Sequence, residues 1–346
     1  MLISGVVRTT SRALQRTVVG SVLGLAALSC TWSTCADAQD ASAGTRRTSV
    51  VAVSDSIKLE VVDWGGQGPL LILLAGSGHT AHVFDGFAPR LTPHLHVMGF
   101  TRRGVGASSR TTHGYDSTTL VRDIVALLDS LGIAKASFAG HSFAGSEMSI
   151  LAARFPDRVE RLIYLDSAFD YKQLDERIGK VLEGGSPEPS DGAYYRGTVA
   201  DWTLLGERSS GPGFPESEVR AMFTFGADGI FKGANRAPET LRLMYQGWES
   251  APFSLIRAPA LALYAAPTSP EVMYPSWYEF DERAKARAAQ MYTVVSQEHA
   301  LQRARFTREV PSSRQVIIPG ARHYLFLTHA GEVAHEMLDF MLATGK

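Results

Sequence analysis

Cysteine is scarce in this 346-residue chain, and its two copies, Cys30 and Cys35, both lie near the N-terminus. An excess of charge is also missing, because 34 basic residues face 35 acidic ones and no block of like charge is present. This balance gives no electrostatic reason to expect a nucleic acid or another polyanion as partner. A hydrophobic content of 45% with 20% charged residues is typical of a folded globular protein.

The first 38 residues have the layout of a secretory signal peptide. Three arginines precede a charge-free stretch, residues 17–36, and Ala36-Asp37-Ala38 places small residues where a signal peptidase reads them. We therefore expect cleavage after Ala38, a secreted or periplasmic protein, and no membrane span in the mature chain. A membrane-anchored form, or a lipoprotein acylated at Cys30, is the less favoured alternative.

Cleavage at this point would remove both cysteines. The mature chain would enter an oxidising compartment without a thiol, which excludes disulfides, thiolate metal sites and cysteine nucleophiles. His94 and His96 alternate along a strand-like segment, but no third ligand accompanies them. We therefore predict neither a metal site nor a cofactor.

Strand and helix patterns alternate from residue 49 to residue 165. Such alternation predicts an α/β fold with a mostly parallel sheet flanked by helices. Leu70–Leu74 is a continuous apolar run of the kind that is buried on both faces of a sheet. The predicted strands are Ser49–Val53, Lys58–Val62, Leu70–Leu74, Leu95–Phe100, Ala136–Ala139 and Leu162–Leu165, and the predicted helices are Thr118–Leu131 and Ala144–Phe155.

The alternation stops after residue 170. Residues 171–251 contain helix-like pieces separated by loops rich in glycine, proline and serine, which predicts a helical cap inserted into a core of residues 39–170 and 252–346. The helix-like pieces are Leu174–Leu182, Glu216–Phe225 and Glu239–Trp248. In the second part of the core, strands Ala260–Tyr264 and Gln315–Ile318 enclose a long helix, Asp281–Arg305.

The stretch FAGHSFAGSE places Ser142 between a predicted strand and a predicted helix. A serine on such an elbow has a strained backbone and needs small residues two positions before and two positions after it. Gly140 and Ala144 occupy those positions, with Gly145 next. A serine nucleophile also needs a base to take its proton. His323, which follows the last strand and the turn Pro319-Gly320, is the histidine in the right position.

Acyl transfer further needs backbone N–H donors that stabilise an oxyanion. The Phe143 amide, directly after the nucleophile, is one candidate. Ser77 is the other, because it lies in the turn AGSGHT after the strand Leu70–Leu74. An ordinary glycine-rich loop explains this turn equally well.

Four segments together resemble the α/β-hydrolase superfamily, in the type with a helical cap. They are LLILLAGSGHTAHVFDGFAPRL, GFTRRGVGASSR, GHSFAGSEMSILAARFPDRVERLIYLDSAFD and VIIPGARHYLFLTHAGEVAHEMLDFM. The resemblance implies the fold of that family and a serine hydrolase that needs no cofactor. Three positions depart from the family pattern: Ala75 replaces a histidine, Thr101 an aspartate and Ala144 a glycine.

A serine–histidine pair also needs an acid that orients the histidine, and this acid is the less regular part of the pattern. In most capped members of the family it follows the strand after the cap, where this chain has Thr268, with Glu271 as the nearest carboxylate. Asp166 ends the strand after the elbow helix, and some haloalkane dehalogenases of similar fold carry their acid on this strand. We predict Asp166, with Glu271 as the alternative and Asp170 as a weaker one.

The sequence thus predicts a secreted serine hydrolase that cleaves a small-molecule ester, or less readily an amide, through an acyl-enzyme. One alternative is a catalytically silent member that binds a small ligand under the cap. Another is a peptidase similar to proline iminopeptidases. Six cap aromatics either line an apolar acyl site or form the cap's own core: Trp202, Phe214, Phe223, Phe225, Tyr245 and Trp248. The sequence carries no signal for an oligomeric state.

Overall fold

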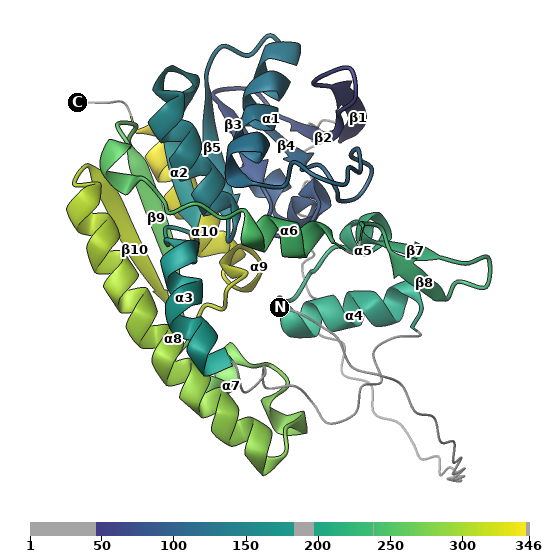
Figure 1. Ribbon diagram of the computed structural model, residues 1–346, viewed down its shortest axis with the longest axis vertical. Helices are drawn as coiled ribbons and strands as arrows, with labels where there is room; N and C mark the ends of the chain where they lie inside the picture. The colour runs from purple at the N-terminus through teal and green to yellow at the C-terminus, as the bar shows by residue number, and fades with distance from the viewer. Residues whose placement is uncertain (1–45, 183–196, 238, 344–346) are drawn as a thin grey trace, which may run out of the picture. The chain divides into compact units, whose positions relative to one another are not determined.

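An eight-stranded sheet organises the chain (Figure 1). In the computed structural model, which describes residues 46–182, 197–237 and 239–343, its strand order is β1-β2-β4-β3-β5-β6-β9-β10. The first three strands in this order pair antiparallel and the others parallel, so the predicted mostly parallel α/β sheet is confirmed. The strands are β1 (Arg47–Ala52), β2 (Lys58–Gly65), β3 (Leu70–Leu74), β4 (His96–Thr101), β5 (Ala136–His141), β6 (Val159–Leu165), β9 (Ala260–Ala266) and β10 (Ser313–Pro319).

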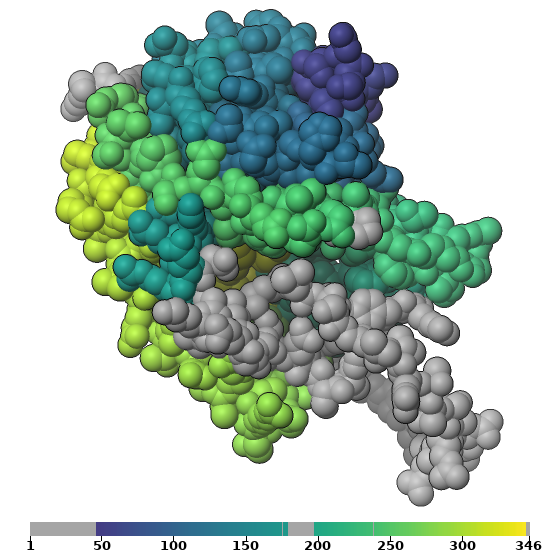
Figure 2. Space-filling view, in the orientation of Figure 1, coloured from purple at the N-terminus to yellow at the C-terminus, as the bar shows by residue number. Residues whose placement is uncertain are grey.

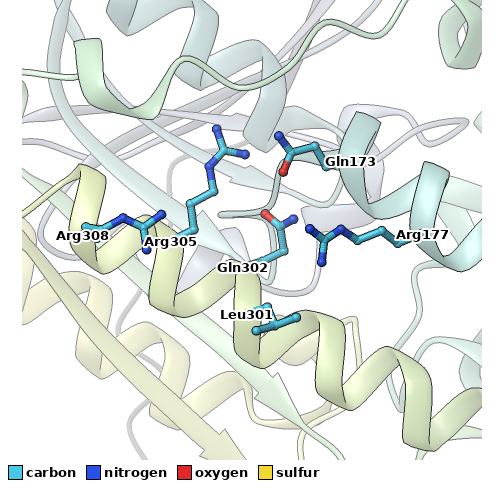
Figure 3. Close-up of a pocket in the computed structure, with 6 residues that line it drawn as sticks. All are labelled: Gln173, Arg177, Leu301, Gln302, Arg305 and Arg308. Atoms are coloured by element: carbon cyan, nitrogen blue, oxygen red, sulfur yellow. The ribbon is translucent and has the colours of Figure 1, made fainter.

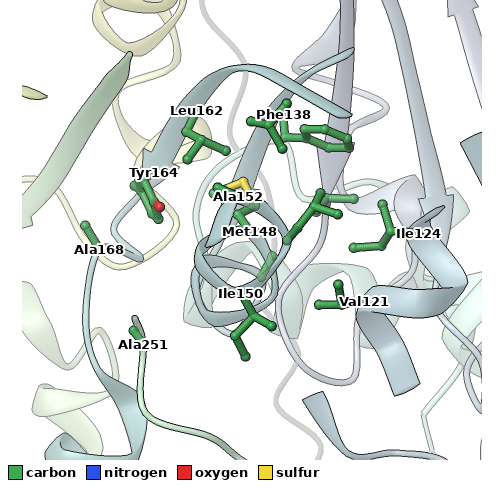
Figure 4. Close-up of a cluster of buried hydrophobic side chains, with 14 of the residues drawn as sticks. Val121, Ile124, Phe138, Met148, Ile150, Ala152, Leu162, Tyr164, Ala168 and Ala251 are labelled. Carbon is green, nitrogen blue, oxygen red and sulfur yellow. The ribbon is translucent and has the colours of Figure 1, made fainter. Parts of the chain in front are cut away.

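Helices cover both faces of this sheet because its parallel strands are apolar on both sides. On β6, Leu162 and Tyr164 pack into one buried cluster, and Ile163 and Leu165 into another. Figure 4 shows part of the first cluster, which side chains of α3 (Tyr171–Leu182) and of three further helices complete. These are α1 (Ser117–Ser130), α2 (Ala144–Arg154) and α8 (Glu282–Glu309), while α9 (Leu325–Thr328) and α10 (Ala330–Leu342) contribute to the second cluster.

Among its described residues, the segment between β6 and β9 contains no strand of the main sheet. We call residues 171–251 the cap segment, and its division from the core stays a prediction. Its described elements are α3 (Tyr171–Leu182), α4 (Val199–Ser209), α5 (Glu216–Met222), β7 (Phe223–Phe225), β8 (Phe231–Ala234) and α6 (Thr240–Gln246).

One helix predicted in the cap segment is wrong at its end. The expected helix Glu216–Phe225 ends at Met222, and β7 follows and pairs antiparallel with β8. The physical reason is aromatic packing across the hairpin. The Phe223 and Phe231 rings lie 4.5 and 4.8 Å from the Trp202 ring on α4, an arrangement that extended strands allow.

The strand order places the candidate site at one edge of the sheet. β3 pairs with β4 on one side and with β5 on the other, so the chain changes direction between β3 and β5. In open α/β sheets, ligands bind outside the carboxyl ends of the strands at such a switch point. The turn after β3 and the elbow after β5 therefore lie next to each other. In the part of the chain that is described, no helix is both long and apolar enough to cross a membrane.

Candidate active site

Ser142 occupies a strained turn between β5 and α2. Its φ of 53° lies in the left-handed region that non-glycine residues rarely adopt. A Cβ added at Gly140 would lie 2.9 Å from the Cβ of Ala144, and one at Gly145 would lie 1.9 Å from the carbonyl oxygen of Ser167. The indispensable glycines are thus at positions 140 and 145. Ala144 is accommodated because Gly140 has no side chain.

Asp166 and His323 meet at the carboxyl ends of β6 and β10. The Oδ2 atom of Asp166 lies 2.7 Å from Nδ1 of His323, and Oδ1 accepts a hydrogen bond of 3.1 Å from the Ala265 amide. Asp166 is 2% exposed and has a φ of 48°, so a buried and strained backbone holds its carboxylate. A carboxylate at Nδ1 fixes the proton there and leaves Nε2 free to act as a base.

The structure places the three acid candidates in different surroundings. Glu271 lies on α7 (Pro270–Met273), where its side chain bonds to Ser269, and within the described residues it makes no hydrogen bond to His323. Asp170 is paired with Arg305 at 2.6 Å. Of the three carboxylates, Asp166 is the one beside the histidine.

The serine and the histidine are close in the fold but not bonded. Across the described ranges, no hydrogen bond joins the Ser142 hydroxyl to His323, and the Ser142 side chain interacts with the Tyr171 hydroxyl. Burial, and then the charge of Asp166, raises the pKa of Tyr171 well above its usual value, so it stays a neutral phenol. Nucleophile–base hydrogen bonds are often long before substrate binds.

The predicted oxyanion donors flank Ser142. A Cβ added at Gly76 would lie 3.1 Å from the Cβ of Ser142, so the turn after β3 packs against the elbow. Neither the Ser77 nor the Phe143 backbone N–H donates a hydrogen bond to any described residue. The Phe143 amide also lies at the N-terminus of α2, where the helix dipole favours negative charge.

Arg102, which sequence reasoning missed, holds this turn to the elbow helix. Its guanidinium group donates to Glu147 of α2 at 3.0 and 2.6 Å, and to the carbonyl oxygens of Gly76 and Ala75 at 2.9 and 2.8 Å. Arg102 and Glu147 are 6% and 3% exposed. We call this arrangement the Arg102 clamp. It joins the two segments that carry the predicted oxyanion donors.

Two buried side chains fix the neighbouring loops. His141 donates from Nε2 to the His323 carbonyl oxygen at 3.0 Å, and burial lowers its pKa well below the usual value, so it stays neutral. Glu218 of α5 accepts hydrogen bonds from the Thr80 amide at 3.0 Å and from Nδ1 of His79 at 2.9 Å. Through Glu218, the cap segment is bonded directly to the turn after β3.

A second buried network surrounds His82, outside the site. Its Nδ1 lies 3.0 Å from Asp85 and its Nε2 lies 3.5 Å from Glu60. Burial opposes its charge, but the hydrogen bonds to Asp85 and Glu60 and their charges prevail and raise the pKa of His82 to about 9. Glu60 also accepts a hydrogen bond of 2.6 Å from Thr101, so a carboxylate lies beside the position where the family has an aspartate.

The six cap aromatics divide into two groups. Trp202, Phe223 and Phe225 pack with β8 as a small core of the cap segment. By contrast, the Tyr245 hydroxyl lies 3.1 Å from the Ser77 hydroxyl, and the Trp248 ring stacks on Phe143 at 5.3 Å. Figure 2 shows green residues of the cap segment against residues of the core coloured blue. The sixth, Phe214, lies edge-on to His79 at 6.1 Å.

The described residues contain no group of three or more histidine, cysteine, aspartate or glutamate side chains that could hold a metal ion. The pair considered in the sequence does not form one, because His96 lies on β4 and bonds to Asp63 at 3.0 Å.

A hollow of about 340 Å³ lies between α3 and α8 (Figure 3). Its cations are already paired: Arg177 with Glu298 at 3.3 Å, and Arg305 with Asp170 and Glu309. Arg308, the third cation, lies 3.6 Å from Glu309, so each described cation of this hollow is paired with a carboxylate. The residues that line it are Gln173, Arg177, Leu301, Gln302, Arg305 and Arg308.

A strained serine after β5, an Asp–His pair and unpaired backbone amides thus lie together at the carboxyl edge of the sheet. Residues 69–188 match the family model described as the alpha/beta hydrolase fold. Together with the strand order, this match shows that the chain has the α/β-hydrolase fold.

Known relatives cover only part of the chain. 2-(Acetamidomethylene)succinate hydrolase of Mesorhizobium japonicum is 29% identical over 121 residues, which are 34% of this chain and 44% of that protein. 2-Hydroxy-6-oxo-2,4-heptadienoate hydrolase of Pseudomonas putida is 27% identical over 187 residues, 48% of this chain and 64% of that protein.

Solved structures share the fold. The crystal structure of E-2-(acetamidomethylene)succinate hydrolase superposes with a TM-score of 0.62 at 19% identity, over 86% of this chain and 100% of that one.

Proposed function

We propose that the protein is a serine hydrolase that cleaves a small-molecule ester, and less readily an amide, through an acyl-enzyme. The observation that carries the proposal is the 2.7 Å hydrogen bond from His323 Nδ1 to the buried Asp166, beside the strained elbow of Ser142. This bond leaves Nε2 as the base that a serine nucleophile requires.

In the proposed reaction, Ser142 Oγ attacks the carbonyl carbon while His323 Nε2 takes its proton. The Ser77 and Phe143 amides donate hydrogen bonds to the negative oxygen of the tetrahedral intermediate. The intermediate collapses, and the leaving alcohol takes the proton from His323. A water molecule, deprotonated by the same histidine, then cleaves the acyl-serine ester and releases the acid.

The names of the relatives support a small organic acid as the acyl part. Two of them are hydrolases named for a succinate and a heptadienoate. Fold and partial identity do not by themselves carry a substrate over to this chain. An activity panel tests the proposal: p-nitrophenyl esters of graded chain length, matched amides, lactones and a prolyl arylamide.

We expect turnover of short esters that is lost in Ser142→Ala. Preference for the prolyl arylamide would favour the peptidase alternative. No turnover of any compound by folded protein would favour the silent, ligand-binding alternative.

We also propose that residues 1–38, which lie outside the described residues, are a cleaved signal peptide and that the mature protein works outside the cytoplasm. The support is the order of arginines, apolar stretch and Ala36-Asp37-Ala38. N-terminal sequencing of the natural protein should return Gln39. An intact Met1, or a lipid on Cys30, would contradict the proposal.

A further inference from the structure

Arg236 is a partly buried arginine of the cap segment that faces the turn after β3. Its Nη1 atom lies 3.9 Å from the place that a Cβ on Gly78 would occupy, and Leu241 lies beside it at 3.4 Å. Gly78 directly follows Ser77, the predicted oxyanion donor. The guanidinium group therefore lies on the cap side of the turn that borders the nucleophile.

The backbone around Arg236 is held from two sides. Val105 of the core forms an antiparallel bridge with Arg236, and the Gly106 amide donates to the Asn235 carbonyl oxygen at 3.1 Å. From the cap side, the Asn235 amide donates to Met222 at 2.6 Å. The backbone of Arg236 is thus held in place by contacts to the core and to the cap segment.

No carboxylate of the described residues pairs with the charge of Arg236. Among the described residues it forms no hydrogen bond or ion pair, and the ionisable neighbour that acts on it is Tyr245, whose hydroxyl lies beside that of Ser77. By contrast, the buried Arg102 and Arg103 are each paired with a carboxylate. Burial lowers the pKa of Arg236. A partly desolvated cation without a counter-charge is costly, so an anion that enters gains a strong interaction.

Resting on the proposed function, we infer that Arg236 binds a carboxylate on the acyl part of the substrate, which makes the preferred substrate a monoester of a dicarboxylic acid. Arginine suits this role because its planar fork matches a carboxylate. The span also fits. Two peptide units separate Gly78 from Gly76, which contacts Ser142, so the guanidinium lies on the order of 10 Å from the nucleophile. An acyl chain of about four to six carbons covers that distance.

The test compares matched pairs of p-nitrophenyl esters of succinate, glutarate and adipate. In each pair the far carboxyl group is free or is methylated. Wild type should favour the free acid in at least one pair. Arg236→Gln should lose about 10- to 100-fold more kcat/KM on that acid than on its methyl ester, mainly through KM, since charged hydrogen bonds have this strength. Arg236→Lys should recover part of the loss.

The control is Arg242→Gln on α6. This arginine is exposed and pairs with Glu239, so its variant removes the same charge a few residues away. Arg242→Gln should leave the preference for the free acid over its methyl ester unchanged. If Arg236→Gln lowers both members of a pair equally, or if wild type does not discriminate between them, the inference is wrong although the esterase proposal stands.

A binding measurement separates the two proposals if no ester is turned over. Monomethyl glutarate and dimethyl glutarate are titrated calorimetrically into Ser142→Ala, with and without Arg236→Gln. Tighter binding of the monoester that depends on Arg236 supports the inference without any catalysis. Equal binding of both esters, or no binding of either, contradicts it.

Discussion

Replacement of Arg102 by lysine tests whether the Arg102 clamp positions the oxyanion donors. Lysine keeps the charge beside Glu147, but its single ammonium group cannot reach two carboxylate oxygens and two carbonyl oxygens together. At least two of the four hydrogen bonds are lost. At about 1.5 kcal/mol for each bond to a charged donor, Arg102→Lys should lower the free energy of unfolding by about 3 kcal/mol.

Arg102→Lys should also slow catalysis in the protein that remains folded. Without the clamp, the Gly76 carbonyl group loses its anchor and the Ser77 amide moves relative to the nucleophile. Removal of one oxyanion donor costs about 10²- to 10³-fold in kcat. A misplaced donor should therefore cost about 10- to 100-fold, with KM little changed. The assay is kcat on folded protein at low temperature, alongside urea unfolding.

Arg103→Lys is the matched control. Arg103 is equally buried and binds Asp123 of α1 with two hydrogen bonds of 2.5 Å, but it contacts no carbonyl group of the turn after β3. By the same count, Arg103→Lys loses at least one of two hydrogen bonds, about 1.5 kcal/mol, and it should keep kcat within a few fold. If Arg102→Lys loses stability while kcat stays at the level of Arg103→Lys, the clamp is merely structural and the reasoning is refuted.

Two further predictions concern the acid and a buried charge. Asp166→Asn should lower kcat about 10⁴-fold with the fold intact, because an amide beside Nδ1 favours the wrong tautomer of His323. Glu271→Gln should keep most of the activity. If kcat assays show the reverse pattern, the acid is Glu271 on α7 and not Asp166. His82, whose folded pKa is raised to about 9, stabilises the fold fully below its unfolded pKa of 6.5, and this stabilisation is lost as pH rises through 9. The difference in unfolding free energy between wild type and His82→Gln should therefore shrink by about 3 kcal/mol between pH 6 and pH 10, and a constant difference in urea titrations would contradict it.

The sheet could be predicted because its signals are local. Runs such as Leu70–Leu74 are apolar throughout, and parallel strands buried on both faces require that. The elbow could be predicted for a similar reason, since small residues must surround a strained serine. Asp166 followed from its position at the end of a strand.

The remaining features depend on contacts between distant parts of the chain. Nothing in the pair Arg102-Arg103 indicates that the first side chain reaches Glu147, 45 residues away, while the second reaches α1. The hairpin β7–β8 was missed because its phenylalanines also suit an amphipathic helix. Arg236 is unpaired among the described residues because the fold places their carboxylates too far from it. The residues next to Arg236 in the sequence do not indicate those distances.

The central claim is that Ser142 is an activated nucleophile. An alkyl fluorophosphonate tests it directly, because an activated serine oxygen attacks phosphorus and expels fluoride, which leaves a stable adduct. The account predicts one adduct on wild-type protein, located at Ser142 by peptide mass spectrometry, absent from Ser142→Ala and formed far more slowly in His323→Gln. Folded wild-type protein that remains unlabelled, or labelling that persists in Ser142→Ala, would contradict it.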